Sequence, residues 1–321
     1  MNNSLSICIP TYNRSIFLKT NLEQLINLCK PLQIPIYISD NCSTDDTGDM
    51  VAKMKEKYNF IFYKKLKENR GIDFNMDSVL NMSQTKFGWL FSDDDEMHEE
   101  SIAYISELIN TEDPSFILSS YLHKRLDTRE IIGGGNLVES DSYEIISPTE
   151  LLEKHAVAMT LLSACIIRID LWKAIKYEDY KSQYYIHLFN ILTHVLRQPK
   201  IIVVGKRLFT RFAGNDWEFK KEDIGFIVPY FYPKTIDSLN GYSYLSKYYG
   251  IKNKKNSRIT VGTLLRLRSQ LKINFIEFPK SYFPLTNVLL PVFITLLLMP
   301  IALSTLLLTM LKTVKAILSN E

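Results

Sequence analysis

Apolar and polar positions alternate in two ways along the first third of the chain. Short β-branched stretches, which predict buried strands, are separated by segments in which apolar residues recur at helical spacing. One such helical segment runs from Phe17 to Cys29 and stops before Pro31. Strands that alternate with helices in this way predict a mostly parallel sheet with helices on both faces. The predicted strands are Ser4–Ile9, Ile34–Ser39, Asn59–Tyr63 and Phe87–Phe91.

A polar cluster directly follows each predicted strand. Because ligands of a parallel sheet bind beyond the carboxyl ends of its strands, we expect these clusters to gather at one edge. The first cluster contains neither a GxGxxG nor a GxxxxGK[ST] pattern, which disfavours a nicotinamide dehydrogenase and a P-loop NTPase. A bound phosphate must then be neutralised by a metal ion and by side chains. The clusters are Thr11–Arg14, Asp40–Asp46, Glu68–Gly71 and Ser92–Glu96.

The last cluster places three consecutive carboxylates, Asp93, Asp94 and Asp95, directly after the apolar residues Trp89–Phe91. Adjacent carboxylates repel one another and lose hydration beside a core. A Mg²⁺ or Mn²⁺ ion removes that cost, because it takes one or two hard oxygen ligands and keeps its other positions for water and phosphates. The alternative is an acidic turn that caps a helix starting near Met97.

The strand–helix alternation continues less regularly and fades after Asp223. Further strands are predicted at Phe116–Tyr121, Ile166–Ile169 and Ile201–Val204, and the glycine run Gly133–Gly135 is interpreted as a flexible turn. We therefore expect a catalytic domain at 1–223, with halves at about 1–97 and 98–223, an aromatic and basic helical region at 224–283, and a hydrophobic tail at 284–321.

The tail predicts membrane association. Leu285–Leu311 contains no charged residue, and it exceeds the ~20 apolar residues that span a bilayer. Pro291 and Pro300 interrupt it and lysines flank both ends, so a single span and a surface-lying hairpin both stay open. The segment Lys252–Lys272 interleaves leucines with basic residues, which favours anionic lipid headgroups. The net charge of +3 is too small to indicate a nucleic-acid partner.

The cysteines indicate a reducing compartment. None of the four lies in a CxxC pattern or at metal-ligand spacing, and Cys8 belongs to an apolar predicted strand. We therefore expect buried free thiols and a cytoplasmic site of action.

These clusters, in this order, resemble the family 2 glycosyltransferases of the GT-A fold, an α/β architecture with a Rossmann-like sheet flanked by helices. A fainter resemblance, carried by Tyr185–His187 and Arg211–Asp216, is to the abequosyltransferase-like O-antigen and polysaccharide sugar transferases. The main resemblance covers roughly the first third of the chain and is specific only in combination. The matching segments are Pro10–Arg14, Ser39–Thr47, Asn69–Gly71 and Ser92–Asp95.

The resemblance implies a nucleotide site. Thr11 and Tyr12 would line the pocket, Asp40 would accept a hydrogen bond from the base, and Asn69 and Arg70 would lie near the ribose and diphosphate. Each residue also has an ordinary alternative. Asp40 can organise its own turn, Tyr12 can pack at the rim, and Arg70 can be a surface charge, although a guanidinium suits bidentate phosphate contact.

The resemblance also implies a metal site. Asp94 and Asp95 are the expected ligands of Mn²⁺ or Mg²⁺, with Asp93 directed toward the ribose. Ser92 stands where many relatives carry the first acid of the motif, so an alignment of the motif shifted by one residue stays open.

The expected reaction is inverting, metal-dependent transfer of a sugar from a nucleotide diphosphate sugar to a hydroxyl of a glycan acceptor. The general base is expected to be His187 or Asp179, with Asp216 as a third candidate. His187 and His194, seven residues apart on one helical face, can instead both be packed histidines.

The tail and the resemblance together imply an acceptor on a lipid carrier, at the cytoplasmic face of a bacterial inner membrane, in O-antigen or capsule biosynthesis. Two other classes stay open, a nucleotidyltransferase and a catalytically silent membrane-bound nucleotide- or glycan-binding protein. The first would usually carry a glycine-rich, basic first loop, and the second would need no metal.

Overall fold

The computed structural model describes residues 4–139, 141–180, 184–213 and 231–252, together with Leu303 and Leu307. The chain divides into two compact units. Unit 1 comprises Met1–Lys181 and Tyr185–Asp216, and unit 2 comprises Ser182–Tyr184 and Trp217–Glu321. The domain boundary expected at Asp223 falls among residues outside the described part, and it stays a prediction.

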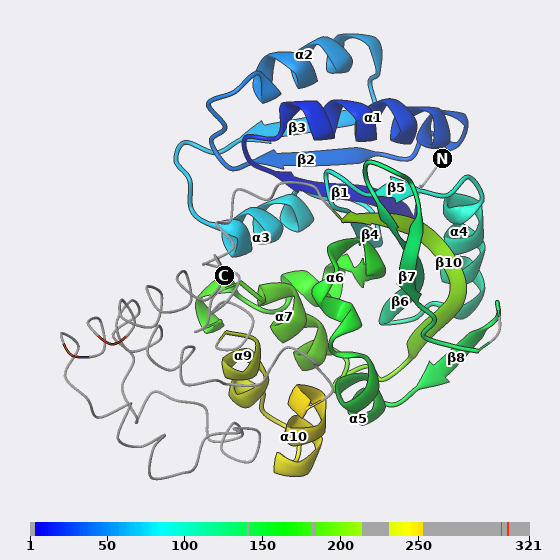
Figure 1. Cartoon of the computed structure of the whole chain (residues 1–321), viewed down its shortest axis with the longest axis vertical. Coiled ribbons are helices and arrows are strands. Elements are labelled where there is room, and N and C mark those ends of the chain that lie inside the picture. The colour runs from blue at the N-terminus through cyan, green and yellow to red at the C-terminus, as the bar shows by residue number, and fades with distance from the viewer. Residues whose placement is uncertain are drawn as a thin grey trace, which may run out of the picture. The chain divides into compact units, whose positions relative to one another are not determined.

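Unit 1 is built on a mixed ten-stranded sheet (Figure 1). The strand order is β3-β2-β1-β4-β9-β6-β10-β5, with β7 paired to β6 and β8 paired to β10. The strands are β1 (Leu5–Thr11), β2 (Ile36–Asp40), β3 (Ile61–Lys65), β4 (Phe87–Leu90), β5 (Glu96–Met97), β6 (Phe116–Arg125), β7 (Ile131–Gly135), β8 (Tyr143–Ile146), β9 (Cys165–Arg168) and β10 (Ile201–Ala213).

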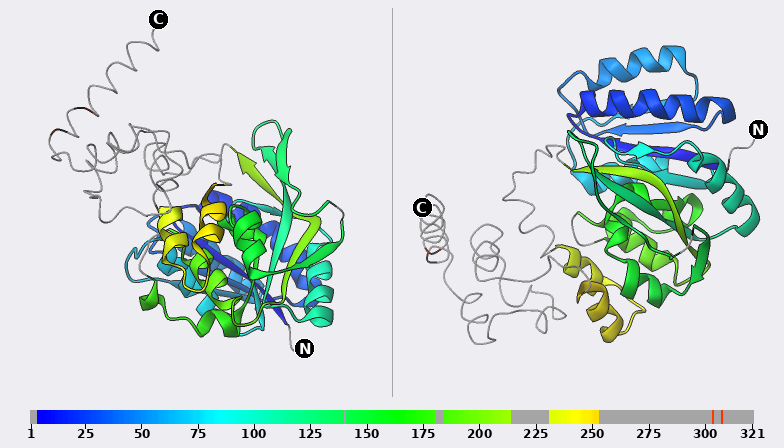
Figure 2. Two further views of the ribbon diagram at one scale, coloured as in Figure 1. Left: turned by 90° about the horizontal axis from the view of Figure 1, so that it is seen from below. Right: turned by 45° about the vertical axis from the view of Figure 1, so that its right-hand side comes forward.

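Helices cover both faces of this sheet (Figures 1 and 2). The helices of unit 1 are α1 (Ser15–Cys29), α2 (Thr47–Lys57), α3 (Ile72–Met82), α4 (Ser101–Glu112), α5 (Pro148–Glu150), α6 (Ile169–Lys173) and α7 (Ile186–His194). Short 3-10 and π turns are η1 (Lys30–Leu32), η2 (Leu151–His155), η3 (Ala158–Thr160), η4 (Leu162–Ala164) and η5 (Tyr177–Asp179). In unit 2, α9 (Tyr232–Ser238) packs with α10 (Tyr244–Lys252), and the Tyr232 hydroxyl donates to the Gly250 carbonyl at 3.0 Å.

The four strands predicted in the first third of the chain all form, and β3, β2, β1 and β4 pair in parallel. Because β1 to β2 and β2 to β3 step in one direction while β3 to β4 returns past β1, right-handed crossovers put α1 and α2 on one face and α3 on the other. The buried strand residues explain why the apolar pattern was readable: each residue of β2 and of β4 is buried. Cys8, Cys29 and Cys165 are buried free thiols, as expected.

The expectation of a mostly parallel sheet is confirmed only in part, because the sheet is mixed beyond β4: β10 pairs in parallel with β6, but the other pairs are antiparallel. The strand β9 runs antiparallel to both β4 and β6, and β5, β7 and β8 also pair antiparallel with their neighbours. Antiparallel pairs need no long crossover helix, so the irregular connections after α4 can feed strands directly into the sheet. The helix expected near Met97 is also displaced, since Met97 belongs to β5 and α4 begins at Ser101.

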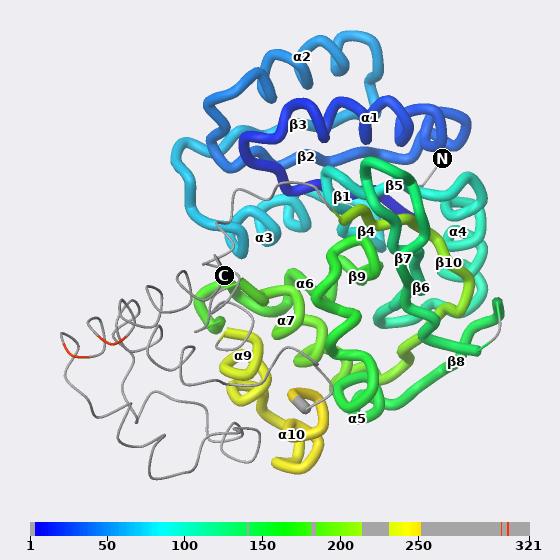
Figure 3. Tube along the Cα trace, viewed as in Figure 1, coloured from blue at the N-terminus to red at the C-terminus, as the bar shows by residue number. Residues whose placement is uncertain are grey.

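The glycine run is a strand rather than a flexible turn. Gly133, Gly134 and Gly135 pair with β6 as part of β7 (Figure 3). A Cβ on Gly135 would lie 2.4 Å from Tyr121 Cε1, and one on Gly134 would lie 2.6 Å from the Tyr121 carbonyl oxygen. Glycine therefore permits the close approach of β7 to Tyr121, whose ring stacks on Phe209 with centroids 5.6 Å apart.

Within the described residues, no helix is long and apolar enough to cross a membrane. The segment Leu285–Leu311, on which we base the membrane prediction, lies outside the described residues apart from Leu303 and Leu307, as do residues 253–272. Membrane association therefore stays a prediction.

Helix α7 turns polar side chains into the protein. His187, Asn190 and His194, spaced three and four residues apart on one face, are each 2% exposed or less. The first backbone amide of the helix, Ile186 N, donates to Asp73 Oδ1 at 3.2 Å, which satisfies a helix-terminal donor. Burial lowers the pKa of His194 from 6.5 to about 3, because a charged imidazolium would lose its hydration there.

This burial predicts an acid-sensitive fold. A histidine with a depressed folded-state pKa contributes stability that is complete above pH 6.5 and is lost as the pH falls toward 3. At pH 5 the expected loss from His194 is roughly 2 kcal/mol relative to pH 7. Urea unfolding of the wild type and of His194→Gln at pH 7 and pH 5 measures it. The variant should lose less stability between these pH values, and an equal loss in both proteins would show that His194 is not the source.

Candidate functional site

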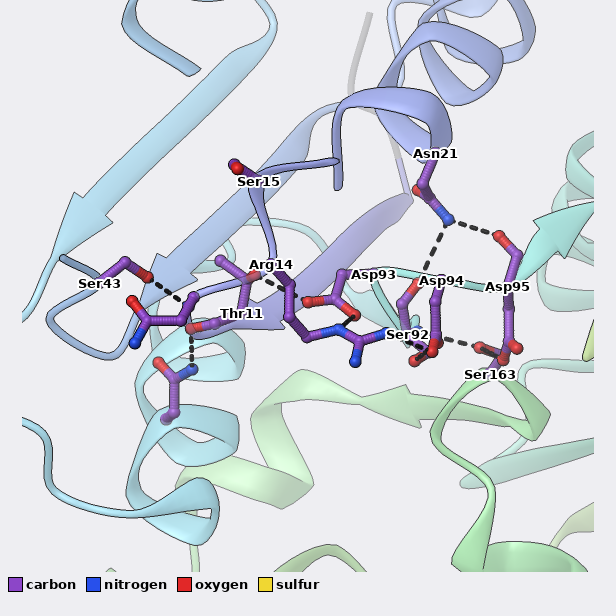
Figure 4. A network of polar contacts seen from close by, with 12 residues as sticks. Thr11, Arg14, Ser15, Asn21, Ser43, Ser92, Asp93, Asp94, Asp95 and Ser163 are labelled. Carbon is purple, nitrogen blue, oxygen red and sulfur yellow. Dashed lines mark hydrogen bonds and ion pairs between the residues drawn. The ribbon is translucent and has the colours of Figure 1, made fainter. Parts of the chain in front are cut away.

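The carboxyl ends of β1, β2 and β4 meet at one edge of the sheet. From β1 the chain adds β2 and β3 on one side, and it then returns to add β4 on the other side of β1. Such a reversal leaves a crevice that α/β folds use for ligands. The Thr11 hydroxyl at the end of β1 donates to Asp93 Oδ2 at 2.8 Å (Figure 4). The backbone amide of Asn41, directly after β2, donates to the Thr11 carbonyl at 3.0 Å. The polar clusters that were expected to gather are therefore in direct contact.

Arg14 bridges two carboxylates of the acidic loop, residues Ser92–Asp95. Its Nε lies 2.9 Å from Asp93 Oδ1, and its Nη2 lies 2.5 Å from Asp94 Oδ2 (Figure 4). The guanidinium also lies 4.4 Å from the centre of the Phe17 ring. The side chains of Arg14, Asp93 and Asp94 are only 16%, 7% and 6% exposed, so this ion pair is weakly screened by solvent.

Asp95 is held from two other elements. Its Oδ2 accepts a hydrogen bond from Ser163 Oγ of η4 at 2.6 Å, and its carbonyl accepts one from the Asn21 side chain of α1. Ser163 Oγ in turn accepts from the Ser92 amide at 2.9 Å. The η4 turn therefore closes the acidic loop from the side opposite Arg14.

Burial makes these carboxylates costly to ionise. It raises the pKa of Asp93 to about 6, although the neighbouring Arg14 charge opposes the rise. It raises the pKa of Asp95 to about 7, and the charge of Asp94 adds to that rise, while Ser163 and the more distant Arg211 of β10 oppose it. A cation brought to the acidic loop would therefore be favoured electrostatically.

The donor set fits a divalent ion that is shared with a substrate. Within the described residues, no group of three His, Cys, Asp or Glu side chains is arranged to hold a metal. Mg²⁺ characteristically takes one or two carboxylates and completes its shell with water and phosphates. Asp94 and Asp95 supply such oxygens. Both oxygens of Asp94 accept hydrogen bonds, from Ser92 and Arg14, as both oxygens of Asp93 do, so an ion at Asp94 must share or displace one of these contacts.

Asp40, the expected partner of a nucleobase, is fully buried at the end of β2. Its Oδ1 accepts from the Ser43 amide at 2.7 Å, and its Oδ2 accepts from the Tyr63 hydroxyl of β3 at 2.6 Å. The carboxylate therefore organises its own loop, which was the alternative weighed from the sequence. Tyr63 was not singled out from the sequence; its place at the third position of an edge strand gave no such signal.

Asn41 connects the loop after β2 to the loop before α3. Its side chain donates to Asn69 Oδ1 at 2.8 Å and accepts from the Arg70 amide at 2.9 Å. Arg70 is exposed, and its guanidinium lies 3.5 Å from the centre of the Phe74 ring. Tyr12 is 38% exposed. Asn69 is thus part of the loop framework, while Arg70 and Tyr12 face solvent.

The two candidate bases lie in different surroundings. His187 is 2% exposed, and its Nε2 lies 3.0 Å from the Met159 carbonyl of η3. Asp179 is exposed at the end of η5. Asp216 lies outside the described residues.

Comparisons with known proteins bear on this edge of the sheet. The family described as Glycosyl transferase family 2 matches residues 6–161, which include all the loops above. The abequosyltransferase RfbV of Salmonella typhimurium is 28% identical over 231 residues, covering 63% of this chain and 66% of that protein, just under two thirds of its length. The probable glycosyltransferase YdaM of Bacillus subtilis is 40% identical over 60 residues, covering 18% of this chain and 14% of YdaM.

Solved structures support the same fold. TarS 1–349 of S. aureus in complex with UDP-GlcNAc superposes with a TM-score of 0.58 at 16% identity, covering 91% of this chain and 81% of that one. TarS in complex with UDP gives a TM-score of 0.52 and covers 85% of this chain and 76% of that one. Residues 6–161, just under half of the chain, are thus similar to the family 2 glycosyltransferases, and the chain shares the fold of the TarS structures.

Proposed function

We propose that the chain is an inverting glycosyltransferase that moves a sugar from a nucleotide diphosphate sugar to a hydroxyl of a glycan acceptor, using Mn²⁺ or Mg²⁺. The observation that carries this proposal is the contact between the end of β1 and the acidic loop, where Thr11 and Arg14 meet Asp93 and Asp94. Because residues 6–161 match the family 2 glycosyltransferase model, that contact supports a nucleotide-side loop that lies beside Asp94, one of the two candidate metal ligands.

The donor is proposed from the family and from the fold. TarS of S. aureus has been solved with UDP-GlcNAc and with UDP, which supports a nucleotide diphosphate sugar as the class of donor. On this chain, Tyr12 and Arg70 are solvent-facing side chains of the loops that follow β1 and β3. We assign Arg70 to the diphosphate, because its planar guanidinium can donate two parallel hydrogen bonds to phosphate oxygens.

The metal is assigned to Asp94 and Asp95. A bound divalent ion would act as a Lewis acid that stabilises the charge of the departing diphosphate. Asp94 and Asp95 would hold it, and Ser163 would keep the Asp95 carboxylate in place through its 2.6 Å hydrogen bond. Thr11 and Arg14 hold the Asp93 carboxylate through both of its oxygens.

We further propose that the acceptor is a lipid-linked glycan, as in the assembly of a bacterial O-antigen or capsule. The similarity to the abequosyltransferase RfbV supports a surface polysaccharide. The uncharged segment Leu285–Leu311 supports action at the cytoplasmic face of the inner membrane. As general base we propose Asp179 ahead of His187, since a base must reach an acceptor hydroxyl and only the Asp179 side chain is exposed.

Replacement of the proposed metal ligands should uncouple nucleotide binding from the metal. We expect calorimetry with UDP, GDP, CDP and dTDP to find at least one nucleotide that binds more tightly with Mn²⁺ than without it. In Asp94→Asn and Asp95→Asn, that gain should fall by about tenfold or more, which corresponds to about 1.4 kcal/mol. Asparagine keeps the size of the side chain but removes the charge that attracts the ion.

The matched control is Asp113→Asn, which removes an exposed acid 2.7 Å from Lys86 at the end of α4. It should bind nucleotide and Mn²⁺ as the wild type does. Wild-type Mn²⁺ enhancement in both acidic-loop variants would contradict the assignment. A preference for nucleoside triphosphates over diphosphates would instead favour a nucleotidyltransferase.

The two candidate bases can be separated by the pH dependence of donor hydrolysis, in which water serves as the acceptor. Asp179→Asn should lower kcat by about 10²–10⁴-fold and change the shape of the profile, because it removes the group that takes the proton. His187→Gln should mainly lower the stability of the fold and keep the shape of the profile. The reverse pattern would assign the base to His187, and wild-type profiles in both variants would exclude both residues.

A further inference from the structure

The position of Arg14 bears on how the proposed metal site fills. Arg14 lies in the turn between β1 and α1, yet its side chain reaches the acidic loop, 79 and 80 residues further along the chain (Figure 4). It uses two different nitrogens for two different carboxylates, Nε for Asp93 and Nη2 for Asp94. One guanidinium therefore ties together an acid assigned to the nucleotide side and an acid assigned to the metal.

Both oxygens of Asp94 are engaged in this arrangement. Its Oδ2 is bonded to Arg14, and its Oδ1 accepts a hydrogen bond from Ser92 Oγ. A divalent ion that binds Asp94 must therefore share or displace the contact with Arg14. It must also approach a fixed positive charge in a place where the carboxylates are less than a tenth exposed and solvent screening is weak.

The local charge balance changes when a diphosphate arrives. Without it, the acidic loop offers three carboxylates, and the guanidinium already offsets one negative charge. A diphosphate adds negative charge that both cations can use, since a guanidinium binds phosphate oxygens as well as carboxylate oxygens. The two cations then no longer compete for the same carboxylate.

We propose that Arg14 acts as a built-in competitor of the divalent ion, so that the ion binds weakly to the free protein and tightly only together with a diphosphate. The proposal rests on the proposed function, because it takes Asp94 and Asp95 as the metal ligands. Thermodynamic reciprocity then requires that the ion strengthen diphosphate binding by the same factor. Arg14 thus makes occupation of the site conditional on the donor.

The chain offers a closely matched control in Arg168 of β9. Its side chain is also 16% exposed, and its Nε also lies 2.9 Å from a carboxylate oxygen, that of Asp170. Its second partner, Asp113, is likewise outside the acidic loop. Arg168→Gln therefore removes an equally buried guanidinium and the same charge from the protein without touching the proposed site, although its two partners are 51% and 59% exposed.

The test measures binding of Mn²⁺ alone, without nucleotide, from the electron paramagnetic resonance signal of the free ion at pH 8. Relative to the wild type, Arg14→Gln should lower the Kd for Mn²⁺ by about tenfold or more, which corresponds to about 1.4 kcal/mol. The Kd of Arg14→Lys for Mn²⁺ should lie between those of the wild type and Arg14→Gln, because one ammonium cannot pair with both acids as the guanidinium does. Arg168→Gln should match the wild type.

A folded Arg14→Gln protein that binds Mn²⁺ no more tightly than the wild type would overturn the proposal. Circular dichroism checks folding, and if Arg14→Gln is unfolded, a Kd for Arg14→Lys equal to that of the wild type would overturn it. Asp94→Asn and Asp95→Asn, introduced into Arg14→Gln, separate this failure from failure of the proposed function. If neither lowers Mn²⁺ binding, the metal site itself is misassigned, whatever Arg14 does.

Discussion

Mutual repulsion among three carboxylates at the buried end of β4 is the constraint on which this site depends. Ionised side chains this close together, and this poorly hydrated, oppose folding unless other groups compensate. Arg14, Thr11, Ser92, Ser163 and Asn21 supply that compensation from elements far apart in the sequence. Breaking a mostly buried ion pair by removing one partner typically costs about 3–5 kcal/mol. The same contacts that stabilise the acidic loop therefore also fix where its oxygens point.

The N-terminal half of the fold was readable from the sequence because β1, β2 and β4 are buried on both faces and its helices are amphipathic. The first four strands, and the meeting of their polar ends, follow from that pattern alone. The second half was harder to read for a physical reason. Short antiparallel strands such as β5 and β8 have little apolar pattern. Gly133–Gly135 forms a strand in which a side chain on Gly135 would collide with the neighbouring Tyr121 ring, and the sequence alone does not show that neighbour.

At the site, residue types were easier to predict than partners. The clustering of Thr11, Asp40 and the acidic triplet was expected, and the contacts between Thr11 and Asp93 agree with it. No local sequence pattern predicted the hydrogen bond from Tyr63 to Asp40 or the ion pair between Arg14 and Asp94. Both contacts depend on how separate strands and loops are placed in three dimensions. Sequence spacing likewise left His187 open as a base or a packed side chain, and its 2% exposure is a property of tertiary packing.

The stretch from η3 to η4 has a consequence for regions remote from the crevice. His187 of α7 contacts the carbonyl of Met159 at one end of this stretch, and Ser163 at the other end holds Asp95. Five residues, Met159–Ser163, thus join a contact made by α7 to a carboxylate that α7 itself does not hold. The position of the Asp95 carboxylate therefore depends on packing inside the protein, around α7 and Met159, as well as on the acidic loop itself.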